Sequence, residues 1–274
     1  MVDEKYWGRS ATGKRPLADV EVNRLIVERR GRRDDFRERL EALSTDLDPL
    51  PPAQRRYGHL YVMVEPESAW LGPPLSDVIA DKLPMQVVLD SLSFNAQLSP
   101  SFSSLRYPVP HPDGVALAAL SHDQMTEEYL LHLLLTDSGS IQLASGQDTR
   151  RYRDEIGISV NYIMEIVHQM LRLAAHLGST YLHYGGTWKV GVHVQGLKGL
   201  FPSQALTESG ALSMRRFSPF QAASYTRTDT ATTTELAERT PTVVENLLRD
   251  LARGVGLQGY FFPYTNPSEI FQKA

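Results

Sequence analysis

A long apolar stripe followed by a strict alternation constrains the fold of this chain more than any other feature. Between Ile156 and Leu177 apolar residues recur at the spacing of one helix face, and Gly178 stands where such a helix would stop. The segment Trp188–Val194 then alternates strictly, which is typical of a strand with one buried face. The chain must therefore contain both long amphipathic helices and a sheet.

The same two periods recur elsewhere in the chain. A strand is predicted at Tyr57–Val64, with Leu60, Val62 and Val64 on one face. Further strands are predicted around Val115–Leu120 and Glu128–Thr136, at Ile141–Ala144 after the turn Asp137–Ser140, and in the threonine-rich segment Ser224–Thr234. Hairpins mixed with long helices predict an α+β fold, in which antiparallel strands and hairpins pack with several long amphipathic helices.

Two proline-containing segments indicate where a helix begins and where the chain turns. Thr240-Pro241 begins a second strong helix, whose predicted core face consists of Val244, Leu247, Leu248, Leu251 and Val255. Prolines at positions 108, 110 and 112, followed by Asp113-Gly114, predict a rigid turn.

The N-terminal region is set apart by composition. A helical pattern from Leu17 to about Leu43 ends in the proline-rich segment Asp46–Pro52, which we interpret as a linker. The sequence therefore predicts two parts, a short N-terminal segment over residues 1–48 and an α+β domain over residues 53–274.

The cysteine count and the ends of the chain restrict the cellular setting. The chain has 274 residues, 42% of them hydrophobic and 22% charged, and no cysteine, which excludes disulfides, thiolate metal sites and a cysteine nucleophile. The first residues carry no apolar signal-peptide core, and the longest apolar runs are far shorter than a membrane span. We expect a cytoplasmic protein without a membrane partner.

Positive charge is concentrated at the N-terminus. The net charge is −4, yet the segment Met1–Arg33 holds nine basic and five acidic residues. Such an excess indicates either an edge that faces a polyanion or a solvated helix face. The candidate phosphate contacts are Arg9, Lys14, Arg15, Arg30, Arg32 and Arg33.

Catalytic signatures are weak throughout. None of the eight histidines forms a short metal-binding pair, and Ser138-Gly139-Ser140 is predicted to be a hairpin tip and not a nucleophile elbow. The segment Gly8–Lys14 has the glycine interval of a phosphate-binding loop, but Arg15 replaces the Ser/Thr that would bind magnesium. We therefore expect no catalytic residue, no metal and no cofactor.

One segment remains a candidate for ligand binding. Tyr181–Trp188 is the densest cluster of aromatic, polar and glycine residues, and His183, Tyr184 and Trp188 could stack on a base or ring. The alternative is that packing of Trp188 and the φ angles of the glycines explain the cluster.

The N-terminal residues resemble part of a known protein family. Tyr6-Trp7-Gly8-Arg9-Ser10, then Thr12–Leu17 and a helix with Glu21-Val22, resemble the closing segment of the Schlafen-type AlbA domain of bacterial proteins. The later segments Gly58–Val62, Gly185–Val194 and Gly196–Gly199 resemble the C-terminal region of such proteins. The resemblance implies DNA binding or ATP binding. The upstream acidic residues on which nuclease activity depends in that family have no counterpart, so the activity is not carried over.

Two functional hypotheses follow. The first is a non-enzymatic regulatory or interaction module of a DNA-binding protein, which contacts the phosphate backbone weakly and binds a protein partner or a second copy of itself. The alternative is an enzyme, or a domain that binds a small molecule or nucleotide in a pocket around His183, Tyr184 and Trp188. The aromatic tail Tyr260–Tyr264 is the candidate for self-association.

Overall fold

The computed structural model describes residues 7–10, 13–16, 35–68, 72–80, 83–92, 100–121, 124–152, 154–207 and 217–257. The chain divides into two compact units, Met1–Arg39 and Leu40–Ala274, so the proline-rich segment that we expected to separate two parts lies inside the larger unit. The predicted tail contact at Tyr260–Tyr264 and the helix start near Leu17 fall outside the described residues.

The smaller unit contains a β-hairpin. Strand β1 (Trp7–Ser10) pairs antiparallel with β2 (Gly13–Pro16), and only two residues connect them. The basic residues after β1, which the sequence suggested as a turn, therefore form the second strand of a two-stranded ribbon.

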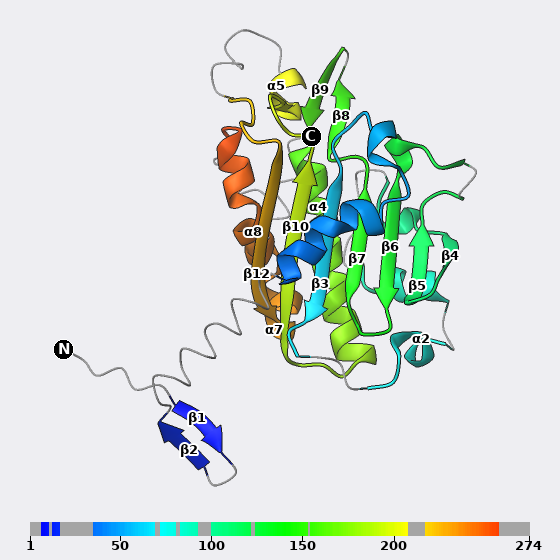
Figure 1. Cartoon of the computed structure of the whole chain (residues 1–274), viewed down its shortest axis with the longest axis vertical. Helices are drawn as coiled ribbons and strands as arrows, with labels where there is room; N and C mark the ends of the chain where they lie inside the picture. The colour runs from blue at the N-terminus through cyan, green and yellow to red at the C-terminus, as the bar shows by residue number, and fades with distance from the viewer. Residues whose placement is uncertain are drawn as a thin grey trace, which may run out of the picture. The chain divides into compact units, whose positions relative to one another are not determined.

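One antiparallel sheet organises the larger unit. Its strands are β3 (Leu60–Pro66), β4 (Tyr107–His111), β5 (Gly114–Ala118), β6 (Leu131–Thr136), β7 (Ile141–Ser145), β10 (Thr187–Gln195) and β12 (Ser224–Thr232). In the described part of the chain they lie in the order β12-β10-β3-β7-β6-β5-β4 (Figure 1). A small second sheet has the order β11-β9-β8, with strands β8 (Thr149–Tyr152), β9 (Glu155–Ile158) and β11 (Phe201–Pro202).

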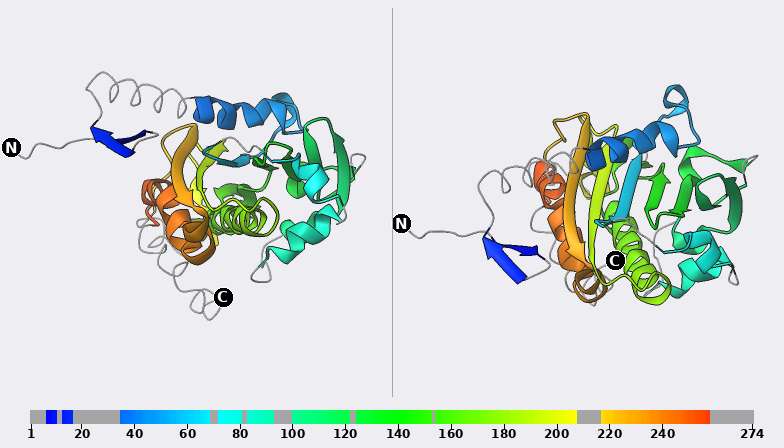
Figure 2. Two further views of the ribbon diagram at one scale, coloured as in Figure 1. Left: turned by 90° about the horizontal axis from the view of Figure 1, so that it is seen from below. Right: turned by 60° about the horizontal axis from the view of Figure 1, so that its bottom comes forward.

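Helices cover both faces of the large sheet (Figure 2). Besides a helix over residues 35–46, the described part of the chain contains the α-helices α2 (Leu75–Val78), α3 (Pro84–Asp90), α4 (Val160–His176), α5 (Ser203–Thr207), α7 (Thr233–Glu238) and α8 (Thr240–Gly254). Helices α4 and α8 pack on one face, and residues 40–46, which belong to a helix over 35–46, lie across the other. The prediction of an α+β fold is confirmed. None of the described helices is both long and apolar enough to cross a bilayer.

The main core lies between the sheet and α4 and α8. Strand β3 contributes Leu60, Val62 and Val64, and β10 contributes every second residue from Trp188 to Val194, as their alternation predicted. The predicted face of α8 is also buried in this core. The expectation of one buried face per strand is wrong for β3 and β10, because Tyr61, Met63 and His193 on the opposite face are buried as well.

Two predicted elements differ in the structure. Ile156 lies in strand β9 and is partly exposed, so α4 begins only at Val160. The chain also continues past Gly178 in a π-helical turn, η5 (Leu177–Tyr181), where Gly178 allows close packing because a Cβ there would lie 2.9 Å from the Trp188 ring.

The predicted turn is present at Pro112-Asp113, between β4 and β5, but the two earlier prolines lie in an edge strand. Pro108 and Pro110 lie in β4, the last strand of the large sheet, opposite Leu117 and Val115 of β5. Only an edge strand tolerates prolines at alternate positions, because the N–H groups that they lack would point away from the neighbouring strand.

The β4–β5 turn generates a prediction about stability. Gly114 has φ +154°, and a Cβ there would lie 2.1 Å from the carbonyl oxygen of Leu135 on β6. We expect Gly114→Ala to lower the free energy of unfolding by about 3 kcal/mol, measured by urea denaturation. Gly199 is the control, since it also has a positive φ (+80°) but nothing within 4 Å, so that Gly199→Ala should cost only about 1 kcal/mol. Equal losses would contradict the role of the close approach.

Candidate functional site

The predicted phosphate contacts fall into two groups. Arg9 and Lys14 are cross-strand partners in the β1–β2 hairpin, and Arg15 is the partner of Gly8. The other three, Arg30, Arg32 and Arg33, lie outside the described residues. The structure therefore brings the first three together on one short ribbon.

In the predicted ligand cluster, Tyr184 and Trp188 pack against each other and bond to neighbouring residues of the chain. Trp188 is fully buried, and its indole N–H donates to the Thr233 hydroxyl at 2.9 Å. The Tyr184 ring meets Trp188 edge-on at 5.2 Å, and its hydroxyl donates to the carbonyl oxygen of Thr187 at 2.7 Å. His183 has a positive φ of 47° and lies in the connection between η5 and β10. These contacts give no argument for a ligand at His183, Tyr184 and Trp188.

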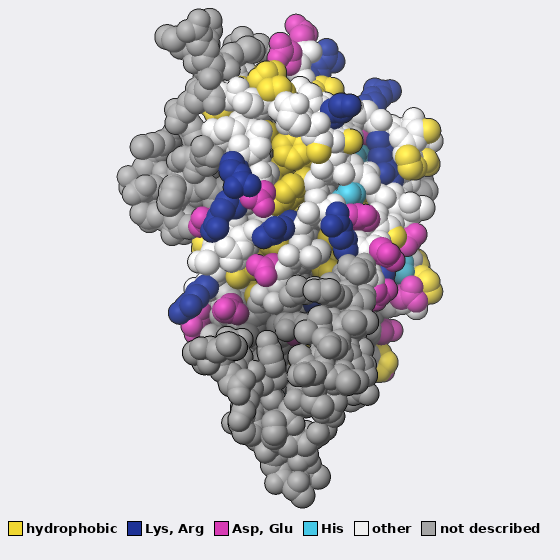
Figure 3. All heavy atoms as spheres, turned by 60° about the vertical axis from the view of Figure 1, so that its left-hand side comes forward, with side chains coloured by type: hydrophobic (Ala, Val, Ile, Leu, Met, Phe, Trp, Pro, Cys, Tyr) yellow, Lys and Arg dark blue, Asp and Glu magenta, His cyan; other side chains and the backbone are white. Residues whose placement is uncertain are grey.

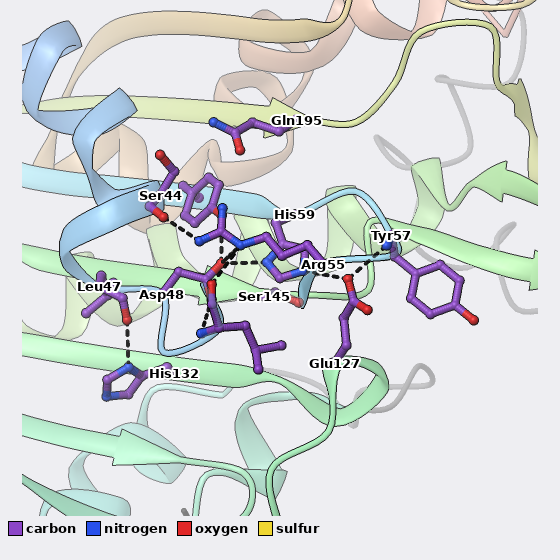
Figure 4. Close-up of polar contacts among 12 residues, drawn as sticks. Ser44, Leu47, Asp48, Arg55, Tyr57, His59, Glu127, His132, Ser145 and Gln195 are labelled. Atoms are coloured by element: carbon purple, nitrogen blue, oxygen red, sulfur yellow. Dashed lines mark hydrogen bonds and ion pairs between the residues drawn. The ribbon is translucent and has the colours of Figure 1, made fainter. Parts of the chain in front are cut away.

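A buried polar network, which the sequence did not single out, lies on the opposite face of the sheet (Figure 4). Its centre is Asp48, in the segment that we interpreted as a linker. One carboxylate oxygen accepts hydrogen bonds from His59 Nδ1 at 2.5 Å and from the Tyr61 hydroxyl at 2.7 Å, and the other accepts from the amide of Leu50 at 2.9 Å. The interpretation as a linker is therefore wrong at Asp48, which is buried.

Arg55 supplies the nearest positive charge to Asp48. Its Nε lies 3.4 Å from the carboxylate and donates to the carbonyl oxygen of Leu50, while Nη2 donates to the carbonyl oxygen of Ser44. The guanidinium thus joins the end of helix 35–46 to the following loop. Because its Nε and Nη2 groups bind these partners, Arg55 acts here as a structural brace.

His59 connects Asp48 to a second carboxylate. Its Nε2 lies 3.0 Å from Glu127 Oε1, so the imidazole is held between two acids. Each ring nitrogen of His59 therefore faces a carboxylate oxygen, and the ring joins the two acids inside the protein.

Glu127 also fixes the loop before β3. Its carboxylate accepts the amides of Arg56, at 2.7 and 2.9 Å, and of Tyr57, at 2.8 Å. The next amide, of Gly58, donates to the Thr149 hydroxyl at 2.6 Å. Three successive amides are therefore satisfied by side chains from distant parts of the chain.

The pKa values of two buried acids, Asp48 and Asp148, are shifted in opposite directions. Burial alone would raise the pKa of Asp48, but the hydrogen bond and charge of His59, with Tyr61 and the Leu50 amide, outweigh it and lower the pKa. Asp148 is fully buried, and burial, with Glu127 nearby, holds its pKa well above the usual range although the amides of Asp148 and Thr149 oppose this. Asp48 is therefore ionised at neutral pH, and Asp148 is a candidate for a buried neutral acid.

The centre of this network is closed to solvent. The side chains of Asp48 and His59 have no exposed surface, and both nitrogens of His59 are taken by carboxylates. A general base needs a free nitrogen within reach of a substrate. In the described part of the chain, no three histidines or acids are grouped as a metal site.

Two cavities open on the outer side of the network. The larger, of about 560 Å³, is lined by Leu50, Ala53, Gln54, Arg55, Arg56, Tyr57, Thr126, Glu127 and Glu128. The smaller, of about 270 Å³, is lined by Tyr57, Glu128, Tyr129, Gly146, Gln147, Thr149, Arg150 and Arg151. Of the described candidates, His183, Tyr184 and Trp188 line neither cavity.

One sequence signal could have indicated the network. His59 and Tyr61 lie two residues apart in a strand whose intervening residues are apolar, which places both on the face opposite the main core. A histidine and a tyrosine on a second strand face suggest a polar layer there. Their partners Asp48 and Glu127 are separated from them in the sequence and carry no local signal.

Comparison with protein-family models, with curated proteins and with solved structures found no match. The resemblance to AlbA-domain proteins stays a prediction, and the functional argument rests on the geometry of this chain.

The Asp48 network predicts acid-sensitive stability. Because the folded pKa of Asp48 is lowered from 3.8, its contribution is present above pH 3.8 and is lost as the pH falls through the folded value. Asp48→Asn leaves His59 and Arg55 without their anion, so we expect a loss of about 3–5 kcal/mol at pH 7 by urea denaturation. The difference from wild type should shrink below pH 3.8, and the exposed Asp154→Asn should change little. A loss independent of pH would contradict ion pairing.

Asp148 predicts the opposite dependence on pH. Its folded pKa is raised above 3.8, so the stability associated with its protonated form is complete below pH 3.8 and is lost as the pH rises through the folded value. Asp148→Asn cannot ionise, and its stability relative to wild type should therefore increase as the pH rises from about 4. Thermal unfolding over a pH series measures this, and parallel curves for the two proteins would contradict it.

Proposed function

We propose that this chain is a non-enzymatic module that binds nucleic acid through its phosphate backbone in the cytoplasm. In this proposal it is the regulatory or interaction region of a bacterial DNA-binding protein of the AlbA-domain type. The observation that carries the proposal is the cationic β1–β2 hairpin.

The shape of the hairpin supports the proposal. A two-stranded antiparallel ribbon has the dimensions that the major groove of DNA admits. The register places Arg9 and Lys14 as a cross-strand pair with Arg15 next along the chain, so three cations lie within a few residues of one another. The cross-strand pair Arg9 and Lys14 falls on one face of the ribbon and Arg15 on the other, because successive residues of a strand face opposite sides. Two cations on one face favour contact with neighbouring phosphates.

In the part of the larger unit that the structure describes, the face that carries β12 and α8 has no large area of positive charge for a polyanion to contact. Lys and Arg side chains alternate there with Asp and Glu (Figure 3). Several are paired, for example Arg227 with Asp250 at 3.6 Å and Arg249 with Glu245 at 3.2 Å. A surface of mixed sign does not attract a polyanion, so the hairpin is the favoured contact.

Backbone contact alone makes binding independent of sequence and dependent on salt. We expect duplex DNA to bind the full chain at low salt, and log K to fall with log salt concentration by about 0.9 for each phosphate neutralised. The triple variant Arg9→Gln, Lys14→Gln, Arg15→Gln should reduce this slope by about three units, measured by fluorescence anisotropy with two unrelated duplexes.

The control removes the same charge elsewhere. Arg106, Arg239 and Arg253 are exposed residues of the larger unit, and the triple variant with glutamine at these positions should keep the wild-type slope. No binding at low salt, or an equal change of slope in both triple variants, would contradict the proposal.

A further inference from the structure

In the described part of the chain, the two edge strands of the large sheet differ in length and composition. At one edge β4 has five residues, and its Pro108 and Pro110 cannot donate to a further strand. At the other edge β12 has nine residues, none of them proline or glycine, and it pairs with β10 at all nine positions. Among the described strands, none pairs with the outer side of β12 (Figure 1). A long, regular edge of this kind can accept a further strand.

The backbone groups that face the open edge belong to the even-numbered residues of β12. The Thr230 amide donates to the Asp229 carboxylate at 2.8 Å, and the Thr232 amide donates to the Glu235 carboxylate at 2.8 Å, so side chains and not β10 bind these two amides. Alternate residues of an antiparallel strand bond to the same side. Thr228, the central residue of β12, therefore also directs its amide and its carbonyl oxygen to the open edge.

Neighbouring elements hold β12 in place on both of its faces. The Tyr225 hydroxyl donates to a main-chain carbonyl oxygen of α8, and Arg227 lies 3.6 Å from Asp250 of the same helix. On the opposite face the Thr226 hydroxyl donates to Glu41 at 3.0 Å. The edge is therefore ordered before a further strand is added, which lowers the entropic cost of binding one.

The sequence of β12, Ser-Tyr-Thr-Arg-Thr-Asp-Thr-Ala-Thr, is complementary to itself in the antiparallel direction. When a second copy of the strand lies beside it with a two-fold axis at Thr228, Arg227 faces Asp229 of the second copy, and the same pair recurs on the other side of the axis. Tyr225 then faces Ala231, and the remaining positions pair threonine with threonine or serine. The charged pairs occupy positions that are not hydrogen-bonded, where facing side chains lie closest. Opposite charges and hydroxyl pairs at facing positions stabilise a sheet, whereas like charges destabilise it.

We infer that β12 pairs antiparallel with β12 of a second copy of this chain, which joins the two large sheets into one continuous sheet across a two-fold axis at Thr228. The Thr230 amide then donates to the facing strand, and the Asp229 carboxylate exchanges that amide for Arg227 of the second copy. The Arg227 side chain is 51% exposed, so it can reach the second copy from its place beside Asp250. Such an interface uses the same residues of both copies and closes after two.

The inference goes beyond the proposed function, because it concerns the larger unit and holds whether or not the hairpin contacts DNA. Its charged pairs also make it specific, since a strand without this order of charges would place like charges opposite one another.

Sedimentation of the full chain over a concentration series measures the association. We expect a reversible dimer of twice the chain mass of 30.7 kDa. Arg227→Asp and Asp229→Arg should each weaken the dimer about tenfold, because each places two pairs of like charges across the axis. The double variant Arg227→Asp, Asp229→Arg restores opposite charges in both pairs and should return the dissociation constant to within about threefold of wild type. The matched control is Asp113→Arg, a 75% exposed residue of the β4–β5 turn, which should leave the association unchanged.

A proline at the centre of β12 tests the backbone contact. Thr228→Pro removes an amide that faces outward and leaves the ladder with β10 complete, so it should abolish the dimer and keep the fold. Circular dichroism and thermal unfolding check the fold of this variant. The charge swap decides the question should Thr228→Pro lower the stability of the chain.

A single thiol tests the register. The chain has no cysteine, so Thr228→Cys carries one thiol, on the axis. The two Cα atoms of such a hydrogen-bonded pair lie about 5.5 Å apart, which is within the range for a disulfide. Mild oxidation should therefore give a covalent dimer. Thr230→Cys is the matched control, because its two copies would lie about 13 Å apart along the strands and should not cross-link.

Four results would overturn the inference. They are a chain that is monomeric at every concentration, which would leave the edge to a strand of another protein; a double variant that associates no better than the single variants; a dimer that survives Thr228→Pro; and equal cross-linking of Thr228→Cys and Thr230→Cys. The hairpin variant Arg9→Gln, Lys14→Gln, Arg15→Gln should form the dimer as wild type does. A loss of duplex binding in that variant bears on the proposed function alone, so the two failures can be told apart.

Discussion

The larger unit depends on the buried carboxylate of Asp48. A charge without solvent is tolerated only when donors surround it, and here His59, Tyr61, Arg55 and the Leu50 amide do so. These donors come from a strand and from the loop before it. Asp48 therefore attaches the end of helix 35–46 and the following loop to the sheet, on the face that the main core does not cover.

The same attachment shapes the outer surface. His59 also contacts Glu127, and the Glu127 carboxylate accepts hydrogen bonds from the amides of Arg56 and Tyr57 beside the two cavities. A chain of buried polar contacts thus fixes the backbone of an exposed part of the surface.

Local patterns predicted much of the main core. The alternation of β10, the spacing in α8 and the turn between β6 and β7 are all found where the sequence placed them. Patterns failed where tertiary contacts override local preference. Pro108 and Pro110 lie in β4, which is the last strand of the sheet. Ile156 lies in β9 and not in the helix, because β9 pairs with β8 and β11.

The sequence by itself determined the α+β class, the core faces of its main strands and helices, and the clustering of cations near the N-terminus, because each depends on residues that are close together in the chain. Only the tertiary structure decided that Trp188 packs inside, that Asp48 and Glu127 meet at His59, and that Tyr57 and Glu128 line two cavities beside them. These groups are separated by up to about a hundred residues, and periodicity carries no information over such separations.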